Sequence, residues 1–392
     1  MYSYRQIKLV SKVLKNNKTN YWTGNECKKF EKEFSNYHKI NYSVSVSNGS
    51  VALEIGLKSL GLKKNDKVIV TPRSFVISAS CVLNLGLRPI FADVDSNGNL
   101  NIEGIRRAFK KNVKAIIIVH LNGLSCDMDP ILEFVKKNNV YLIEDCSQAH
   151  GAIYKNKKVG SFGDISTWSF CQDKIISTGG EGGMISTNNK RLWYKIWSLK
   201  DHGKNYKKVF YKNHKTGFRW IHDYVGSNYR MTEIQAVIGR EQLKLLDKQI
   251  FKRNLIAKLY LSELRDYYEK NKIFKKPNFK CQTCPLKENK KKCNKCLHAY
   301  YRLNLFLNKD KIDQIKLIKQ LNKNNINCGI GSCPEIYREK VFQKSNLYPK
   351  KAMPNAKLLG RLSISFPINP YKSVLKIKRE ISIIKKTIKK FI

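Results

Sequence analysis

Lys174 stands in the segment whose residue types are best suited to covalent chemistry. Residues 168–183 read WSFCQDKIISTGGEGG, so the lysine follows the hydroxyl of Ser169 and precedes a glycine cluster. A lysine that holds an aldehyde cofactor as a Schiff base must lose its proton readily and lie beside backbone that permits close approach, which burial and glycines provide. The pattern predicts such a lysine, although a lysine taken at random from so basic a chain is normally a solvated surface residue.

A carboxylate and a phosphate site accompany this lysine. Asp145 ends the apolar run VYLIED and is followed by Gln148. A pyridine cofactor needs such a carboxylate, because an ion pair keeps the ring nitrogen protonated and the ring able to accept electrons. Asn48, Gly49 and Ser50 lie at a strand-to-helix junction, where the N–H groups of a helix N-terminus bind phosphate. The alternatives are an aspartate that caps a loop and an ordinary helix cap.

Alternating strands and helices are expected to position these residues. Apolar runs such as KVIVTP, AIIIVH and VYLIED are separated by helical patterns, which is typical of buried parallel strands with crossover helices. Functional residues in such sheets collect at the carboxyl ends of the strands. A helical stretch then leads to a second unit, so we predict a large domain over residues 1–245 and a smaller C-terminal α/β domain over residues 246–392. The amphipathic C-terminal helix is expected to pack on the small domain and not on a membrane.

The order of the motifs resembles the DegT/DnrJ/EryC1/StrS family of pyridoxal-phosphate sugar aminotransferases. The resemblance is carried by SNGSVAL at 47–53, TPRSFVISAS at 71–80, FADVD at 91–95, VHLNG at 119–123, EDCSQAHGA at 144–152, SFCQDK at 169–174, GGEGGM at 179–184, KDHG at 200–203 and GSNYRMTEIQAVIG at 226–239. It implies an α/β fold similar to aspartate aminotransferase (fold type I), with a mostly parallel seven-stranded sheet in the large domain.

The resemblance also implies a role for each matching residue. Lys174 would be the catalytic lysine, Asp145 the partner of the pyridine nitrogen and Gln148 the residue that faces the ring hydroxyl. Phe75 would stack on the ring, with a core phenylalanine as the alternative. The complete set implied to bind pyridoxal 5'-phosphate is Gly49, Ser50, Phe75, Asp145, Gln148, Ser169, Lys174 and Asn228.

Asn228 implies more than one subunit, because its counterpart in the family contacts the cofactor phosphate of a neighbouring subunit. The resemblance therefore implies a homodimer with shared active sites. The implied reaction moves an amino group from glutamate to a nucleotide-linked keto-deoxyhexose, typically 4-keto-6-deoxy, for the synthesis of surface glycans or related amino sugars. Arg230 is a candidate for binding the donor carboxylate or the diphosphate of the sugar nucleotide.

The chain departs from the family pattern at two positions that could affect substrate specificity, and the family offers one alternative activity. Cys171 and Asn122 stand where the family often has histidine and tyrosine, so we expect both positions, with the GSCPEIY segment at 331–337, to affect substrate contacts. A dehydratase branch of the family has histidine at the position of Lys174, so the lysine favours transamination. A pyridoxal-phosphate-dependent sugar dehydratase is the alternative within this family.

Four cysteines mark an insertion at about residues 275–297. Cys281, Cys284, Cys293 and Cys296 form two CxxC pairs, a spacing that suits tetrahedral coordination of structural zinc. Free thiols, a redox pair and an iron–sulfur cluster are the alternatives. A metal held by four protein ligands would leave no open position for catalysis.

The overall composition limits which other classes of protein the chain could belong to. The chain has 392 residues, 42% of them hydrophobic, and a formal net charge of +45. It has no apolar run as long as the roughly 20 residues that span a bilayer, and we expect a cytoplasmic protein with reduced thiols and no membrane insertion. The charge raises a rival hypothesis, a zinc-bearing nucleic-acid-binding regulator. Because basic residues are spread along the chain, we interpret them as solvated surface and expect no nucleic-acid partner.

Overall fold

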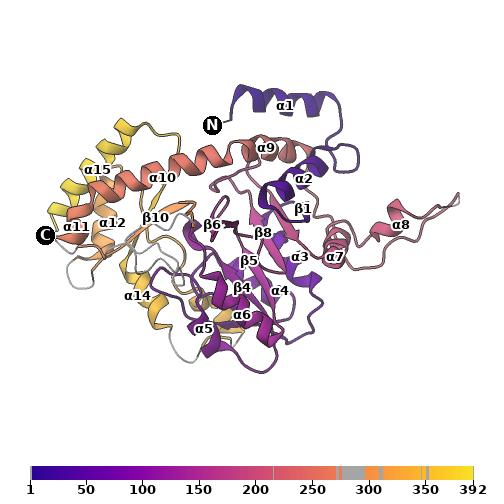
Figure 1. The fold of residues 1–392 in the computed structure, drawn as a ribbon, viewed down its shortest axis with the longest axis horizontal. Coiled ribbons are helices and arrows are strands. Elements are labelled where there is room, and N and C mark those ends of the chain that lie inside the picture. Colours follow the sequence, from indigo (N-terminus) through magenta and orange to yellow (C-terminus); the bar gives the residue numbers. More distant parts are fainter. Residues whose placement is uncertain are drawn as a thin grey trace.

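A seven-stranded sheet forms the centre of the protein in the computed structural model, which describes residues 2–214, 216–270, 273–275, 296–308, 312–345, 347–349 and 353–391 (Figure 1). The strand order is β1-β9-β8-β5-β4-β2-β3. The strands are β1 (Tyr42–Val46), β2 (Lys67–Val70), β3 (Arg88–Phe91), β4 (Val113–Val119), β5 (Tyr141–Asp145), β8 (Ile165–Ser169) and β9 (Gly183–Thr187). Strand β9 is antiparallel to both neighbours, and the other pairs are parallel. The prediction of a mostly parallel seven-stranded sheet is confirmed.

The central strand β4 shows why these sequences form strands buried on both faces. Its run VKAIIIV is rich in β-branched residues, which suit the pleated backbone. Successive side chains point to opposite faces, so Ala115 and Ile117 join one hydrophobic cluster while Ile116 and Ile118 join another. An apolar run without polar alternation therefore indicates a sheet covered on both sides.

Helices cover both faces of the sheet. One face packs against α3 (Gly49–Ser59), α4 (Ile77–Asn84) and α7 (Lys190–Lys200). The other face packs against α5 (Ile102–Ala108) and α6 (Met128–Asn138) and, near β8 and β9, against α2 (Glu26–His38) and α9 (Glu233–Lys244). This layered arrangement leaves the carboxyl ends of the parallel strands at one edge of the sheet, where connecting loops gather.

A second, two-stranded sheet lies in the C-terminal part of the chain. Strand β10 (Arg302–Phe306) pairs antiparallel with β11 (Ser363–Pro367), so that Arg302 is opposite Pro367. The helices around it are α10 (Leu246–Glu263), α11 (Arg265–Glu269), α12 (Gln314–Lys323), α14 (Pro354–Leu362) and α15 (Val374–Lys389). The 3-10 turn Ile336–Arg338 and α13 (Lys340–Lys344) instead pack against β3 of the large sheet, where Tyr337 and Phe342 contact Phe91. The apolar stripe of α15, with Ile377, Ile381, Ile384 and Ile388, is buried in the core of this region, as expected. The domain boundary at residue 245 stays a prediction.

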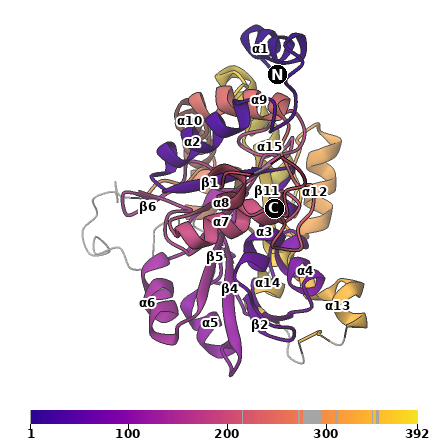
Figure 2. The ribbon, with the colours of Figure 1, turned by 90° about the vertical axis from the view of Figure 1, so that its right-hand side faces the viewer.

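Two peripheral elements leave the body of the protein. Helix α1 (Tyr4–Lys15) lies over α9, and α8 (Tyr206–Phe210) begins a segment that projects away from the sheet (Figures 1 and 2).

The short strands β6 (Ile153–Tyr154) and β7 (Lys157–Lys158) form a small hairpin, and Leu121–Gly123 forms a 3-10 turn after β4. No helix in the described part of the chain is long and apolar enough to cross a membrane.

Candidate active site

Seven of the eight predicted cofactor residues line one cavity of about 650 Å³. They lie at the ends of β5 and β8, at the start of α3 after β1, and on the loops that follow β2, β5 and β8, the last of which carries Lys174. The residues are Gly49, Ser50, Phe75, Asp145, Gln148, Ser169 and Lys174. The cavity lies at the edge where the parallel strands end, so sheet topology and not proximity in sequence brings these side chains together.

Lys174 lies on the loop between β8 and β9 with its side chain 18% exposed. Its Nζ is 3.2 Å from Asp173 Oδ1 and 5.2 Å from the centroid of the Tyr301 ring. Burial acts to lower the pKa of Lys174, but Tyr301 and Asp173 outweigh burial and raise the pKa above its usual value. The expectation that burial makes this lysine easy to deprotonate is therefore wrong for the free chain, because a carboxylate beside the amine stabilises the ammonium form.

Asp145 and Gln148 present complementary groups to the cavity. Asp145 accepts hydrogen bonds from Ser78 Oγ at 3.0 Å and from the backbone N–H of Ser147 at 3.1 Å. Both donors are neutral, and Asp145 forms no ion pair with the described residues, so its buried charge is available to a cationic ring nitrogen. Gln148 Oε1 accepts the N–H of Asn122 at 2.8 Å, which leaves its NH2 group as the end that donates.

The start of α3 forms a narrow cradle against Ser169. Asn48 caps the helix by accepting the N–H of Val51 at 2.9 Å, so the first N–H groups after it are left unpaired by the helix. A Cβ added to Gly49 would lie 2.6 Å from Cβ of Ser169. Only glycine permits this close approach, and the result is a site where backbone N–H groups and the hydroxyls of Ser50 and Ser169 face one cavity.

Phe75 and Asn228 differ in where the structure places them. The Phe75 side chain is 66% exposed and lines the cavity, so it is not a core phenylalanine and its ring face is available for stacking. Asn228 is exposed and does not line the cavity of its own chain. Its backbone pairs with Asp201, whose Oδ1 lies 2.8 Å from Arg230 Nη1. Arg230 is therefore held by an internal ion pair and does not line the cavity either.

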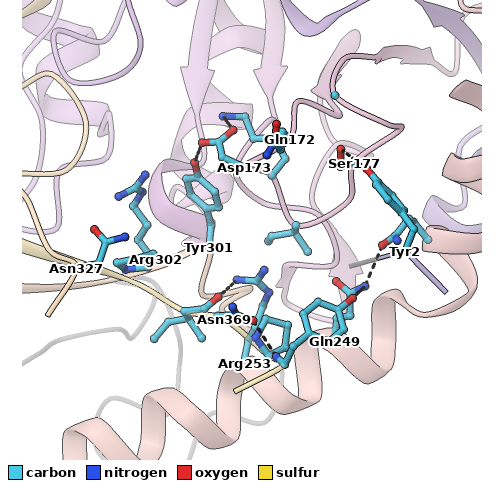
Figure 3. Close-up of a pocket in the computed structure, with 18 of the residues that line it drawn as sticks. Tyr2, Gln172, Asp173, Ser177, Gln249, Arg253, Tyr301, Arg302, Asn327 and Asn369 are labelled. Carbon is cyan, nitrogen blue, oxygen red and sulfur yellow. Dashed lines mark hydrogen bonds and ion pairs between the residues drawn. The ribbon is translucent and has the colours of Figure 1, made fainter. Parts of the chain in front are cut away.

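Sequence reasoning missed several residues of the cavity. Ser78 holds Asp145, and Asp173 pairs with Lys174. The hydroxyl of Tyr301 donates a hydrogen bond to Asp173 (Figure 3). Asp173 was visible as the acidic neighbour of the lysine. Tyr301 carried no such signal, because it lies 128 positions further along the chain than Asp173. The structure also places Cys171 and the start of the 331–337 segment in the cavity, whereas Asn122 only contacts Gln148.

A buried cluster of His120, Glu144 and Cys146 has metal-ligand residue types but a structural geometry. His120 Nδ1 accepts the N–H of Cys126 at 3.1 Å, so Nε2 carries the proton and donates to Glu144 at 3.0 Å. The Glu144 carboxylate also accepts the N–H groups of Gly160, Phe162 and Gly163. With its oxygens occupied in this way, Glu144 anchors the loop before β8 and is not a metal ligand.

Three of the four clustered cysteines, Cys281, Cys284 and Cys293, lie outside the described residues. Cys296 is described, and its Sγ accepts the backbone N–H of Lys155 at 3.4 Å.

The sheet topology and the cavity built around one lysine define a pyridoxal-phosphate enzyme of the aspartate-aminotransferase-like class. The model of the DegT/DnrJ/EryC1/StrS aminotransferase family matches residues 3–384. The chain therefore belongs to this family, which confirms the predicted family and fold and favours an aminotransferase over a nucleic-acid-binding regulator.

Named relatives are similar to this chain over part or all of its length. GDP-perosamine synthase of Escherichia coli O157:H7 is 38% identical over 64% of this chain and 66% of its own length. The dTDP-3-amino-3,6-dideoxy-alpha-D-galactopyranose transaminase of Aneurinibacillus thermoaerophilus is 35% identical over 63% of this chain and 65% of its own length. The crystal structure of an aminotransferase from Psychrobacter cryohalolentis superposes with a TM-score of 0.94 at 40% identity, covering 100% of this chain and 98% of the other.

The residues present fit pyridoxal 5'-phosphate on structural grounds. Asp145 offers a buried carboxylate without a cationic partner among the described residues, and Gln148 offers an amide donor. The cradle between Gly49 and Ser169 is the kind of backbone-lined site that binds phosphate. Lys174 supplies the amine at the same cavity.

Proposed function

We propose that this protein transfers an amino group from glutamate to a nucleotide-linked keto-deoxyhexose, most simply a 4-keto-6-deoxy sugar, for amino-sugar and polysaccharide synthesis. The observation that carries the proposal is the convergence of Lys174, Asp145, Gln148 and the Gly49–Ser169 cradle on one cavity. Relatives named as GDP-perosamine synthase and as a dTDP-amino-sugar transaminase support a nucleotide sugar as the acceptor.

In this proposal each residue of the cavity has a separate role in binding the cofactor or moving a proton. Bound pyridoxal phosphate supplies a ring that stabilises negative charge on the carbon next to the reacting nitrogen. Asp145 keeps a proton on the ring nitrogen, Gln148 donates a hydrogen bond to the ring oxygen, and Phe75 covers one ring face. Gly49, Ser50 and Ser169 hold the phosphate. Lys174 Nζ would hold the cofactor and, once the donor has displaced it, would carry a proton from the α-carbon of the donor to the cofactor carbon that bears the reacting nitrogen, which is the shift that transamination requires.

The direct test is product analysis. The enzyme loaded with pyridoxal phosphate is incubated with glutamate and a panel of GDP-, dTDP- and UDP-linked 3-keto and 4-keto sugars, and the products are identified by mass spectrometry. We expect an amino sugar from at least one acceptor and return of the aminated cofactor after glutamate alone. Loss of a sugar hydroxyl without gain of nitrogen would instead identify a dehydratase.

We further propose a homodimer in which Asn228 of each chain reaches the cofactor phosphate of the other. Asn228 is exposed and lies outside its own cavity, next to a segment with exposed aromatic side chains such as Phe218 and Trp220, which are 76% and 83% exposed. Apolar surface of this extent is typical of an interaction site. The projecting position of this segment after α8 suits a contact with a second subunit (Figure 1).

Subunit complementation tests the shared site. Mixed dimers of Lys174→Ala and Asn228→Ala chains contain one site in which both residues are intact. We expect each variant alone to be weak and the mixture, after unfolding and refolding together, to recover activity. No recovery from dimers that demonstrably contain both chains would contradict a shared site.

The proposal of structural zinc at Cys281, Cys284, Cys293 and Cys296 rests on their spacing. The N–H that Lys155 donates to Cys296 Sγ is the kind of contact that orients a metal-binding sulfur. Metal analysis of the purified protein and of the variant with all four cysteines changed to serine tests it, and equal zinc contents in both would exclude this site.

A further inference from the structure

The segment that carries Asn228 is fixed to the large sheet. The backbone N–H of Ser47 donates to the oxygen of Tyr229 at 2.9 Å. Arg230 forms an isolated antiparallel bridge with Val46, the last residue of β1. Ser47 leads directly into the phosphate cradle at the start of α3. The segment therefore extends the sheet at its β1 edge, next to the phosphate site of its own chain.

The same segment also pairs with the end of α7. The backbone N–H of Tyr229 donates to the oxygen of Lys200 at 3.0 Å. Asp201, the residue that follows α7, forms an isolated antiparallel bridge with Asn228. Backbone contacts therefore hold the segment on two elements at once, the sheet and α7.

The Asp201 side chain adds an ion pair to these backbone contacts. Its carboxylate is fully buried, and Oδ1 lies 2.8 Å from Arg230 Nη1 and 3.1 Å from Lys204 Nζ. The side chains of Arg230 and Lys204 are only 13% and 21% exposed. Charge-assisted hydrogen bonds shielded from water in this way are strong, and loss of one partner is costly. Because Arg230 stands two residues after Asn228, the ion pair ties the segment to Asp201 by a side chain as well as by the backbone.

The Asn228 side chain stays available to a ligand outside its own chain. It is exposed, and it lines neither the cofactor cavity nor a second cavity of about 770 Å³ that also borders Lys174. An amide on a backbone that is already fixed loses little conformational freedom when it binds, so more of its hydrogen-bond energy goes into affinity. The contacts around Asn228 thus prepare it to bind a group supplied by another chain.

We propose that Asp201 is a positioning residue for the cofactor site of the neighbouring subunit. Asp201 holds the segment against the end of α7, and the segment presents the Asn228 amide to the cofactor phosphate of the other chain. Asp201 lines neither cavity of its own chain, so it acts on the cofactor through Asn228 and not by contact. This assignment rests on the proposed homodimer with shared active sites.

Cofactor affinity tests the assignment without catalysis. The apoprotein is titrated with pyridoxal phosphate, and the visible absorbance of the cofactor attached to Lys174 reports binding. In Asp201→Asn we expect the affinity to fall by about 10-fold, because a misplaced Asn228 amide loses its hydrogen bond to a charged phosphate. The loss should not exceed that of Asn228→Ala, which removes the amide altogether.

Two further variants control this titration. Asp201→Asn leaves Arg230 and Lys204 without their buried carboxylate, so its free energy of unfolding should fall. Arg230→Gln keeps Asp201 paired with Lys204 and should lower cofactor affinity in the same direction. Asp266→Asn removes an exposed carboxylate of α11 and should bind the cofactor as the wild type does. Wild-type affinity in Asp201→Asn, or in Arg230→Gln where Asp201→Asn does not fold, would overturn the proposal.

Mixed dimers decide whether Asp201 acts on its own cofactor site or on that of the neighbouring chain. One chain carries Asp201→Asn and the other Lys174→Ala, with a different affinity tag on each so that the mixed dimer can be isolated. Only the Asp201→Asn chain attaches the cofactor, and the phosphate there meets Asn228 of the Lys174→Ala chain, in which Asp201 is intact. We expect wild-type affinity at this site, in contrast to weak binding by dimers of Asp201→Asn alone. A merely structural role would weaken the site of its own chain, so weak binding by the mixed dimer refutes the assignment.

The same experiment with Asn228→Ala in place of Asp201→Asn separates this proposal from the proposed homodimer. If the Lys174→Ala chain rescues Asn228→Ala but not Asp201→Asn, the shared site stands and only the role of Asp201 is wrong. If it rescues neither, the shared site itself is refuted and the role of Asp201 with it.

Discussion

Two lysines, the half-buried Lys174 and the fully buried Lys200, show how differently one side chain behaves in two regions of this protein. Lys174 lies at the border of two cavities beside Asp173, and its pKa is raised by Tyr301 and Asp173 in spite of burial. Lys200 ends α7 with no exposed surface, and its Nζ lies 3.3 Å from the centroid of the Tyr21 ring. Burial lowers the pKa of Lys200 to about 8, although Glu31 and Asp201 oppose that shift.

The difference teaches that a perturbed lysine is not by itself a reactive one. By burial alone Lys200 is the better candidate for a neutral amine at moderate pH. It is fully buried and lines neither of the two cavities that Lys174 borders, so a cofactor or substrate in those cavities does not reach it. The pKa of Lys174 is less favourable for a neutral amine, but Lys174 lies where a cofactor and a substrate can reach it. Access to a cofactor and substrate decides which lysine reacts, and a neighbouring carboxylate decides the pH at which it does.

The largest effect is expected on transamination and cofactor attachment when each of the two lysines is substituted in a separate variant. Lys174→Ala should lower transamination by at least about 100-fold, because it removes the group that transfers the proton. Borohydride reduction followed by mass spectrometry should find no cofactor attached to this variant and should find it attached to Lys200→Met. A cofactor adduct on Lys200 in Lys174→Ala, or loss of the adduct in Lys200→Met, would contradict the comparison.

A smaller effect, on the pH dependence of cofactor attachment, is expected when the carboxylate beside Lys174 is removed. Because Asp173 raises the pKa of Lys174, Asp173→Asn should lower that pKa and increase the neutral fraction of the amine at a given pH. The pH profile for the rate of cofactor attachment, followed by visible absorbance, should therefore move to lower pH. Asp266→Asn removes an exposed carboxylate paired with Lys270 on α11 and should leave the profile unchanged. A shift to higher pH in Asp173→Asn would be contrary to this assignment.

The smallest effect concerns stability and Lys200. Its pKa is about 8 when folded, against about 10.4 in an unfolded chain, so between these values the unfolded state binds a proton that the folded state does not. The free energy of unfolding should rise with pH across this window, and the cost of the buried charge is fully present below it. Relative to Lys200→Met, the wild type should gain about 3 kcal/mol between pH 8 and 10.5 in denaturant unfolding.

The matched control for this last prediction is Lys248→Met, which removes an exposed lysine of α10. Its stability relative to the wild type should stay constant over the same pH range. If Lys200→Met also tracks the wild type across the window, Lys200 is already neutral or already solvated, and the contrast with Lys174 disappears.

Much of the fold was predictable because it depends on local patterns. Runs such as AIIIV in β4 and VYLIED before Cys146 indicate strands by composition alone, and their carboxyl ends become one edge once the strands are parallel. Asp145, Ser169 and the Asn48–Ser50 junction could therefore be assigned to a common edge from sequence. The antiparallel direction of β9 could not be predicted from the sequence, because the direction of a strand depends on the strands with which it pairs.

The sequence by itself determined the chemistry of this protein: a lysine, a strand-end carboxylate and a glycine–serine cradle, each recognisable from its neighbours. Only the tertiary structure decided what surrounds that chemistry. Tyr301 and Arg302 enter the site from a strand far along the chain, and Asp173 raises the pKa that burial was expected to lower. The physical reason is that hydrophobic patterning acts over a few residues, whereas the contacts that set charge, access and substrate space join segments distant in sequence.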